Sequence, residues 1–157
     1  MYPHFKELFA VFNAKSVRYL VVGGYAVSLH VQPRTTKDLD LFLKADLSNA
    51  QAIYQALAEF GAPISEFSPG DFENPQVFFR FGREPQAVDL LFEVPGVDFD
   101  AAWDRRIEVV VDDQVGTVAH FMSREDLISS KLASGRLRDL ADVEDLRASG
   151  DSQAPGA

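Results

Sequence analysis

The sequence predicts an α+β fold in which helices cover a mixed β-sheet, and three observations indicate it. Apolar runs typical of strands alternate with helical patterns up to residue 60, two hairpin-like pairs of strands follow, and two helical patterns come last. This order fits neither a regular β-α-β series nor an all-β sandwich. The 157 residues suffice for one domain with a buried core. We expect that domain at residues 1–148 and a disordered tail at 149–157.

The first half of the chain is assigned from the spacing of its apolar residues. Four of them recur at helical spacing after Pro3 and predict an amphipathic first helix: Phe5, Leu8, Phe9 and Phe12. The next elements are expected in the order strand 17–22, short helix 24–29, strand 38–43 and a helix that ends near residue 60. Asp46 or Ser48 is the expected N-cap of that last helix, because both side chains can accept a hydrogen bond from its first turn.

Two hairpins and two helices complete the predicted fold. The hairpins are expected to join residues 76–81 with 86–92, and residues 107–111 with 115–121. Ser123 and Asp126 have the spacing of a capping box for a helix that ends at Gly135. Asp139 and Asp142 are candidate caps of a final helix that runs to about residue 148. We expect these C-terminal helices to close the functional site.

Composition excludes several kinds of site. The chain has no cysteine, which excludes disulfides, thiolate zinc sites and cysteine nucleophiles. Its three histidines do not have the H-x-x-x-H spacing, so an imidazole metal site is not expected. A metal would therefore be Mg²⁺ or Mn²⁺ bound by oxygen ligands. Because the chain has neither a long apolar run nor a signal-like N-terminus, we expect a cytoplasmic protein that does not bind membranes.

Asp38 and Asp40 are the most informative pair of acids. The chain contains four acidic-x-acidic patterns, about as many as chance would produce, so context must distinguish them. The other three fall in a predicted turn, at a helix start and on a helix. Only this pair lies in an apolar strand, where a charge is costly unless it is paired or bound to metal. Alternate strand residues share a face about 7 Å apart, which can bracket two divalent cations for in-line nucleotidyl or phosphoryl displacement.

Two further features suit a phosphate-handling site. Gly23 and Gly24 end the first strand, where they would let the backbone approach a phosphate chain closely. Asp89 is the candidate third carboxylate, either a metal ligand or a general base, because it lies mid-strand between apolar residues. Asp89 could instead be the partner of a salt bridge, and Glu93 is the alternative third carboxylate.

Several polar side chains are candidates for contact with phosphate. Lys131 lies on the apolar stripe of its predicted helix, so it points either to a nucleotide triphosphate or along the surface of the core. Thr36, with Arg34 and Thr35, precedes the aspartates and could bind phosphate or order the loop. The G-x-G-x-x-G and P-loop motifs are absent, so dinucleotide and P-loop sites have no support.

The strand, the glycine pair and the aspartates together resemble the polymerase-β-like nucleotidyltransferase superfamily. Thirteen residues separate the Gly-Gly at 23–24 from the Asp-x-Asp at 38–40, which stands on the next strand. Asp89 matches the third carboxylate that the family carries on a later strand. The resemblance implies a nucleotidyltransferase-like sheet closed by C-terminal helices.

Within that superfamily, the chain is most similar to small bacterial AbiE-type toxins and their uncharacterised relatives. The similarity lies in residues 33–40 and 126–143 and extends over roughly residues 17–147. In such relatives, a helix lysine near the C-terminus approaches the triphosphate, which here corresponds to Lys131. The chain is shorter than the larger toxins and has little room for a separate substrate-binding domain.

The resemblance implies transfer of a nucleoside monophosphate from an NTP such as ATP to an acceptor hydroxyl, with Mg²⁺ or Mn²⁺. The implied catalytic and metal-binding residues are Asp38, Asp40 and Asp89, and the implied nucleotide-binding residues are Gly23, Gly24, Thr36 and Lys131. The acceptor stays open among RNA such as a tRNA end, a protein and a small molecule such as an aminoglycoside. The net charge of −9 slightly disfavours RNA, whereas basic residues in the last helices slightly favour it.

Other interpretations stay open. The chain could serve in a toxin–antitoxin or phage-defence system, with a cognate antitoxin as its partner. It could instead be a non-catalytic nucleotide-binding or antitoxin-type protein with the same fold. A third hypothesis is a plain α+β interaction domain whose acids form salt bridges.

Overall fold

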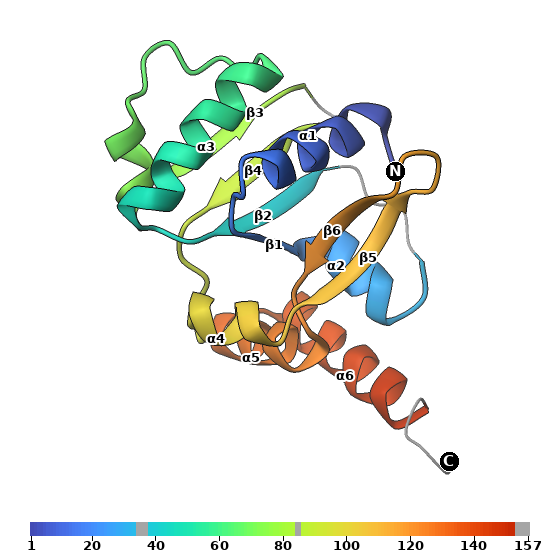
Figure 1. Ribbon diagram of the computed structural model, residues 1–157. Coiled ribbons are helices and arrows are strands. Elements are labelled where there is room, and N and C mark those ends of the chain that lie inside the picture. The colour runs from blue at the N-terminus through green and yellow to red at the C-terminus, as the bar shows by residue number, and fades with distance from the viewer. Residues whose placement is uncertain (34–37, 84–85, 153–157) are drawn as a thin grey trace.

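The computed structural model describes residues 1–33, 38–83 and 86–152 (Figure 1). Along the chain, the elements are α1 (Pro3–Ala14), β1 (Tyr19–Val22), α2 (Gly23–His30), β2 (Leu39–Leu43), α3 (Leu47–Phe60), the 3₁₀ helix η1 (Pro69–Glu73), β3 (Phe78–Phe81), β4 (Val88–Leu91), α4 (Phe99–Asp104), β5 (Ile107–Asp112), β6 (Thr117–Phe121), α5 (Arg124–Ser134) and α6 (Leu137–Ser152). The predicted α+β class and the predicted order of elements are confirmed. None of the helices described is long and apolar enough to cross a membrane.

The strands form one mixed sheet in the order β3-β4-β2-β1-β6-β5. Both predicted hairpins are present, because β3 pairs antiparallel with β4 and β5 pairs antiparallel with β6. In the centre, β1 is antiparallel to β2 and parallel to β6, and β2 is parallel to β4. The end of β1, the start of β2 and the start of β4 therefore lie side by side at the same end of the sheet.

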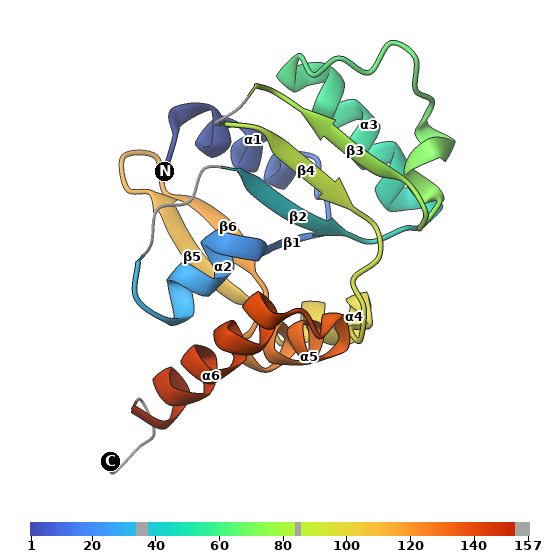
Figure 2. The same cartoon turned by 180° about the vertical axis from the view of Figure 1, so that it is seen from behind.

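Helices cover the two faces of the sheet unequally. The four apolar residues predicted to line α1 are fully buried, and α1 and α3 together cover one face (Figures 1 and 2). On that side, Phe79 and Phe81 pack against aromatic rings of η1 and α3. Figure 2 shows the opposite face of the sheet, where no helix of the described chain lies over β3 and β4. On β2, Phe42 of this face packs against Phe99 of α4, and α2 begins beside the start of the strand. Side chains that alternate with the buried ones along these three strands point to this open face.

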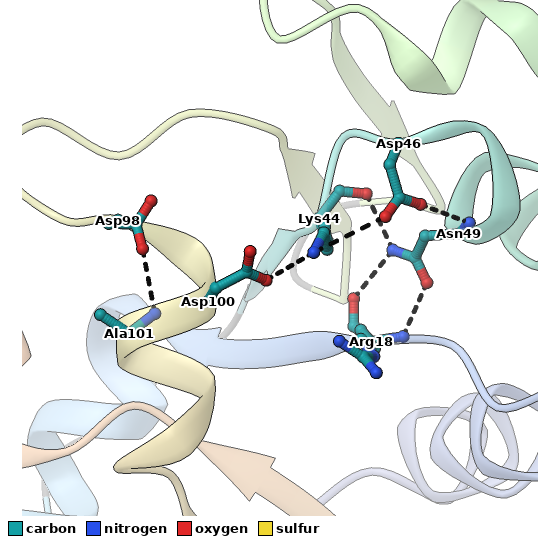
Figure 3. A network of polar contacts seen from close by, with 7 residues as sticks. All are labelled: Arg18, Lys44, Asp46, Asn49, Asp98, Asp100 and Ala101. Atoms are coloured by element: carbon teal, nitrogen blue, oxygen red, sulfur yellow. Dashed lines mark hydrogen bonds and ion pairs between the residues drawn. The ribbon is translucent and has the colours of Figure 1, made fainter.

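A buried asparagine joins the start of β1 to the end of β2 (Figure 3). The Asn49 side chain accepts a hydrogen bond from the Arg18 amide at 2.8 Å and donates to the carbonyl oxygens of Arg18 at 3.1 Å and Lys44 at 2.9 Å. Asp46 is the N-cap of α3 and accepts from the Asn49 amide at 2.7 Å, so Asp46, of the two expected caps, is the one that forms. Lys44 Nζ lies 2.6 Å from Oδ1 of Asp100 and thereby ties this corner to α4.

The two C-terminal helices differ in how well they were predicted. The Ser123 hydroxyl accepts from the Asp126 amide, and α5 is followed by the predicted Gly135 in the left-handed conformation. The Asp126 carboxylate does not complete the predicted capping box, because it accepts from the Ser123 hydroxyl and pairs with Arg105. Helix α6 begins at Leu137, so the expected capping by Asp139 and Asp142 is wrong, because both residues lie inside the helix. Their carboxylates are instead taken up by ion pairs with basic side chains.

Helix α6 also continues past its predicted end at residue 148 to Ser152, so residues 149–152 are helical and not part of the expected tail. Residues 153–157 lie outside the described chain. Contacts with other helices explain the extension: the Ser149 hydroxyl donates to the carbonyl oxygen of His30 at the end of α2, and Gly150 lies against Arg124 of α5. Tertiary packing therefore stabilises a turn that the small, polar local sequence does not favour.

Candidate active site

The sheet register lines up two acids and one arginine across adjacent strands. Val22 of β1 pairs with Asp40 of β2, Asp40 pairs with Asp89 of β4, and Asp89 pairs with Arg80 of β3. Because Arg80 lies between the inward-facing Phe79 and Phe81, this row belongs to the open face of the sheet. Neighbouring strands are about 5 Å apart, so the side chains in the row are direct neighbours.

Asp38 joins the row from the bend that precedes β2. Its Oδ1 accepts a hydrogen bond from the Ala87 amide at 3.2 Å, which fixes the carboxylate beside the start of β4. Its Oδ2 lies 3.5 Å from Nη2 of Arg80. The structure therefore brings Asp38, Asp40 and Asp89 together at one end of the sheet. Asp38 does so from the bend and not from the predicted strand 38–43, because β2 begins at Leu39.

Burial and the neighbouring acids disfavour the ionised form of Asp40. The pKa of Asp40 is raised to about 7, first by burial of the side chain and then by its hydrogen bond with Asp89 and the negative charges of Asp89 and Asp38. The positive charge of Arg80 offsets part of this effect. Like charges held this close do not all ionise at neutral pH unless a cation compensates them.

Gly23 is required at its position for two reasons. Its φ of +67° lies in the left-handed region, which favours glycine. A Cβ atom there would stand 2.2 Å from Oδ2 of Asp40, so any side chain would displace the carboxylate. Gly24 follows as the second residue of α2, and the N-terminal end of this helix thus begins beside the acids.

Arg80 is the site residue that sequence reasoning missed. Its guanidinium binds Asp89 through two parallel contacts, Nε to Oδ1 at 2.6 Å and Nη2 to Oδ2 at 2.9 Å. The salt bridge considered as an alternative role of Asp89 is therefore present. In the sequence, Arg80 is visible only as an arginine between Phe79 and Phe81 in a predicted hairpin. Its pairing with Asp89 depends on the register between β3 and β4.

The remaining candidates lie elsewhere or outside the description. Lys131 of α5 makes ion pairs with α6, at 2.9 Å to Oδ2 of Asp142 and 3.5 Å to Oδ1 of Asp139. Glu93 is exposed and follows the end of β4 that is remote from the row. Thr36, with Arg34 and Thr35, falls outside the described residues.

The donor set fits a hard divalent cation, but its arrangement is not that of a metal site as it stands. Carboxylate oxygens are the ligands that Mg²⁺ and Mn²⁺ prefer. Within the described ranges, no group of three or more histidine, cysteine or acidic side chains is arranged to hold a metal ion. The bidentate contact of Arg80 occupies both oxygens of the Asp89 carboxylate.

Comparison with known proteins identifies related sequences and folds. The model of a family described as nucleotidyltransferase of unknown function (DUF6036) matches residues 4–150. No curated protein shows significant sequence similarity to the chain.

Three solved structures share the fold at low sequence identity. The lincomycin-bound lincosamide antibiotic adenylyltransferase LnuA superposes with a TM-score of 0.53 at 15% identity, over 94% of this chain and 97% of that one. ANT(2″)-Ia in complex with adenylyl-2″-tobramycin gives 0.55 at 14% identity, over 96% and 87%. An antigenic nucleotidyltransferase-like protein from Paracoccidioides brasiliensis gives 0.51 at 17% identity, over 96% and 75%. At these identities, the likeness is one of fold.

Proposed function

This chain belongs to the family described as nucleotidyltransferase of unknown function, whose model matches residues 4–150, and from that membership we propose a reaction. The proposed reaction is a metal-dependent transfer of a nucleoside monophosphate from an NTP to an acceptor hydroxyl. The observation that carries the proposal is the register pairing of Asp40 with Asp89, with Asp38 held beside them. A salt-bridge cluster at the surface would not require glycine at position 23, where an added Cβ atom would collide with the Asp40 carboxylate.

Each carboxylate has a proposed role. Asp38 and Asp40 would hold Mg²⁺ or Mn²⁺, and Asp89 would either complete this site or accept the proton of the acceptor hydroxyl. When bound, the ions would offset negative charge on the triphosphate and on the pyrophosphate that leaves. The acceptor oxygen forms a bond with the α-phosphorus, the bond between that phosphorus and the pyrophosphate oxygen breaks, and the hydroxyl proton passes to a carboxylate.

The proposed nucleotide contacts begin at the end of β1. Gly23 and Gly24 would let the backbone approach the triphosphate, and the amides at the start of α2 favour negative charge there. Thr36 and Lys131 complete the proposed set. Lys131 would have to exchange its ion pairs with Asp139 and Asp142 for phosphate oxygens, because its ammonium is engaged by α6.

The acceptor class and the biological role are finer parts of the proposal. A small-molecule hydroxyl is supported by LnuA, which is lincomycin-bound and of which this chain covers 97%, so a chain of this size can suffice for such an acceptor. RNA and protein hydroxyls are the competing acceptors. We also propose kinship with AbiE-type enzymes, and hence a role in a toxin–antitoxin or phage-defence system, on the sequence pattern of residues 33–40 and 126–143.

Transfer of label from α-labelled nucleotide tests this proposal. Each NTP is incubated with the protein, Mg²⁺ or Mn²⁺, and a cell extract divided into RNA, protein and small-molecule fractions. We expect label in one fraction, and its loss in an Asp38→Asn/Asp40→Asn variant. An Asp112→Asn/Asp113→Asn variant removes the same charge from the last residue of β5 and the first residue of the turn that follows it, and should retain transfer. Nucleotide binding without any labelled fraction would instead support a non-catalytic binding protein.

A further inference from the structure

Arg80 makes contacts that a cation bound among the carboxylates would have to replace. Its guanidinium binds both oxygens of Asp89 at 2.6 and 2.9 Å, and its Nη2 lies 3.5 Å from Oδ2 of Asp38. It therefore bridges two of the three acids proposed to bind metal. It also lowers the cost of ionising the third acid, since its charge acts on Asp40 against the effects of burial and of the other acids.

The position of Arg80 suits a group that can leave. Its side chain retains 44% of its exposure, whereas that of Asp89 retains 9%, so the guanidinium lies on the solvent side of the carboxylate. Arg80 also belongs to β3, an edge strand of the sheet. Rotation of a long, half-exposed side chain on an edge strand does not require the sheet to move.

The charges in the row make Arg80 and a metal ion alternatives. Among residues 38–83 and 86–152, Arg80 is the cation that the structure records against these carboxylates, and charge-assisted bidentate pairing is its strongest mode of binding. A divalent ion at the same carboxylates would be repelled by the Arg80 guanidinium at short range. It would also have to compete with Arg80 for both oxygens of Asp89. Binding of the ion then costs the free energy of breaking the Arg80–Asp89 pair.

We propose that Arg80 is an internal counter-cation that occupies the carboxylates of the metal-free enzyme and is displaced from Asp89 when the divalent ion binds. This proposal rests on the proposed metal-dependent function. It predicts that the protein binds its metal more weakly than the same acids would without Arg80. The arginine thereby keeps Asp89 paired in the free enzyme, where an unpaired buried carboxylate would be destabilising.

Titration with Mn²⁺ in the absence of nucleotide tests the proposal, with free Mn²⁺ followed by its electron paramagnetic resonance signal. The variants are Arg80→Gln, which removes the charge, and Arg80→Lys, which keeps it. Arg138→Gln removes the same charge from an exposed position on α6 and serves as the matched control. We expect Arg80→Gln to tighten Mn²⁺ binding at least about tenfold, because a single neighbouring charge changes the affinity for a proton by that factor or more. Arg80→Lys and Arg138→Gln should stay near the unsubstituted protein.

The outcomes separate this proposal from the proposed function. Equal Mn²⁺ dissociation constants for the unsubstituted protein and Arg80→Gln, with both losing binding when Asp38 and Asp40 are replaced, would overturn the role of Arg80 and leave the metal site intact. Weaker binding by Arg80→Gln would make Arg80 a support of the site and also overturn the proposal. If neither protein binds Mn²⁺, the metal-dependent function fails as well. Circular dichroism checks that Arg80→Gln is folded; if it is not, tighter binding by Arg80→Ala or Arg80→Met carries the same test.

Discussion

At the scale of single residues, Asp40 combines a stability cost with a proposed function. Its carboxylate is buried beside Asp89 and near Asp38, and these neighbours with burial raise its pKa to about 7. An ordinary aspartate titrates near 4, so the folded metal-free protein favours the protonated form of Asp40 over a range in which the unfolded chain is ionised. Groups with pKa values shifted in this way are common at catalytic and ligand-binding sites.

We expect Asp40→Asn to stabilise the metal-free protein at pH 8 and to have little effect at pH 4. Because the folded pKa is the higher one, the contribution of Asp40 to stability is full below pH 4 and is lost as the pH rises from about 4 to about 7. Asparagine stays neutral throughout, so the gain at pH 8 should be roughly 2–4 kcal/mol.

Urea unfolding in EDTA at both pH values measures this difference. Asp113→Asn, at an exposed position in the turn between β5 and β6, is the control and should follow the unsubstituted protein. If the stabilities of Asp40→Asn and the unsubstituted protein keep a constant difference between pH 4 and pH 8, Asp40 is ionised in the folded protein and the interpretation is wrong.

The sequence was informative about the acids of the site and much less about its basic residues. Asp38, Asp40 and Asp89 could be grouped in advance, because an acid within an apolar strand needs a partner wherever it lies. Arg80 could not, since an arginine in an alternating strand usually faces solvent and its partner depends on the register of the hairpin. For Lys131, the helical stripe predicted an inward direction, but whether it meets phosphate or acids depends on what α6 presents to it.

At the scale of elements, Asn49 holds together the start of α3, the start of β1 and the end of β2. It is 5% exposed, and its amide satisfies two backbone groups of Arg18 and one of Lys44 (Figure 3). The sequence predicted the helix and two candidate caps but not this residue, because its partners lie in the chain segments that flank two different strands. Similarly, the true end of α6 depended on contacts with α2 and α5 that no local pattern encodes.

Replacement of Asn49 should therefore destabilise the protein more than replacement of the cap. We expect Asn49→Ala to lower the free energy of unfolding by roughly 2–3 kcal/mol, because buried backbone groups lose their partners. Asp46→Ala should cost about 1 kcal/mol, the usual value of an N-cap. Ser48→Ala, at the exposed alternative cap, should change stability by less than about 0.5 kcal/mol. Chemical denaturation of the three variants gives the order, and a cost for Ser48→Ala equal to that for Asp46→Ala would contradict the assigned cap.

At the scale of the whole molecule, the net charge of the protein disfavours binding of the proposed NTP. The chain carries a net charge of −9, and the edge of the sheet at which β1, β2 and β4 meet adds clustered carboxylates. An NTP is itself strongly anionic, so its encounter with this surface is unfavourable without a cation to neutralise part of both charges. The mixed sheet gathers the acids on a face that α1 and α3 leave open, and this exposure would allow the proposed cation and nucleotide to reach them together (Figure 2).

Binding of NTP should for this reason depend strictly on the divalent ion. At an NTP concentration about 100 times its dissociation constant, Mg²⁺ and NTP together should add about 2.7 kcal/mol to stability, a rise in melting temperature of roughly 5–10 °C for a domain of this size. NTP with EDTA should leave the melting temperature unchanged, and so should Mg²⁺ with NTP for Asp38→Asn/Asp40→Asn. A shift of equal size in EDTA would mean that the nucleotide binds through basic residues alone, and the carboxylate row would then have no part in holding it.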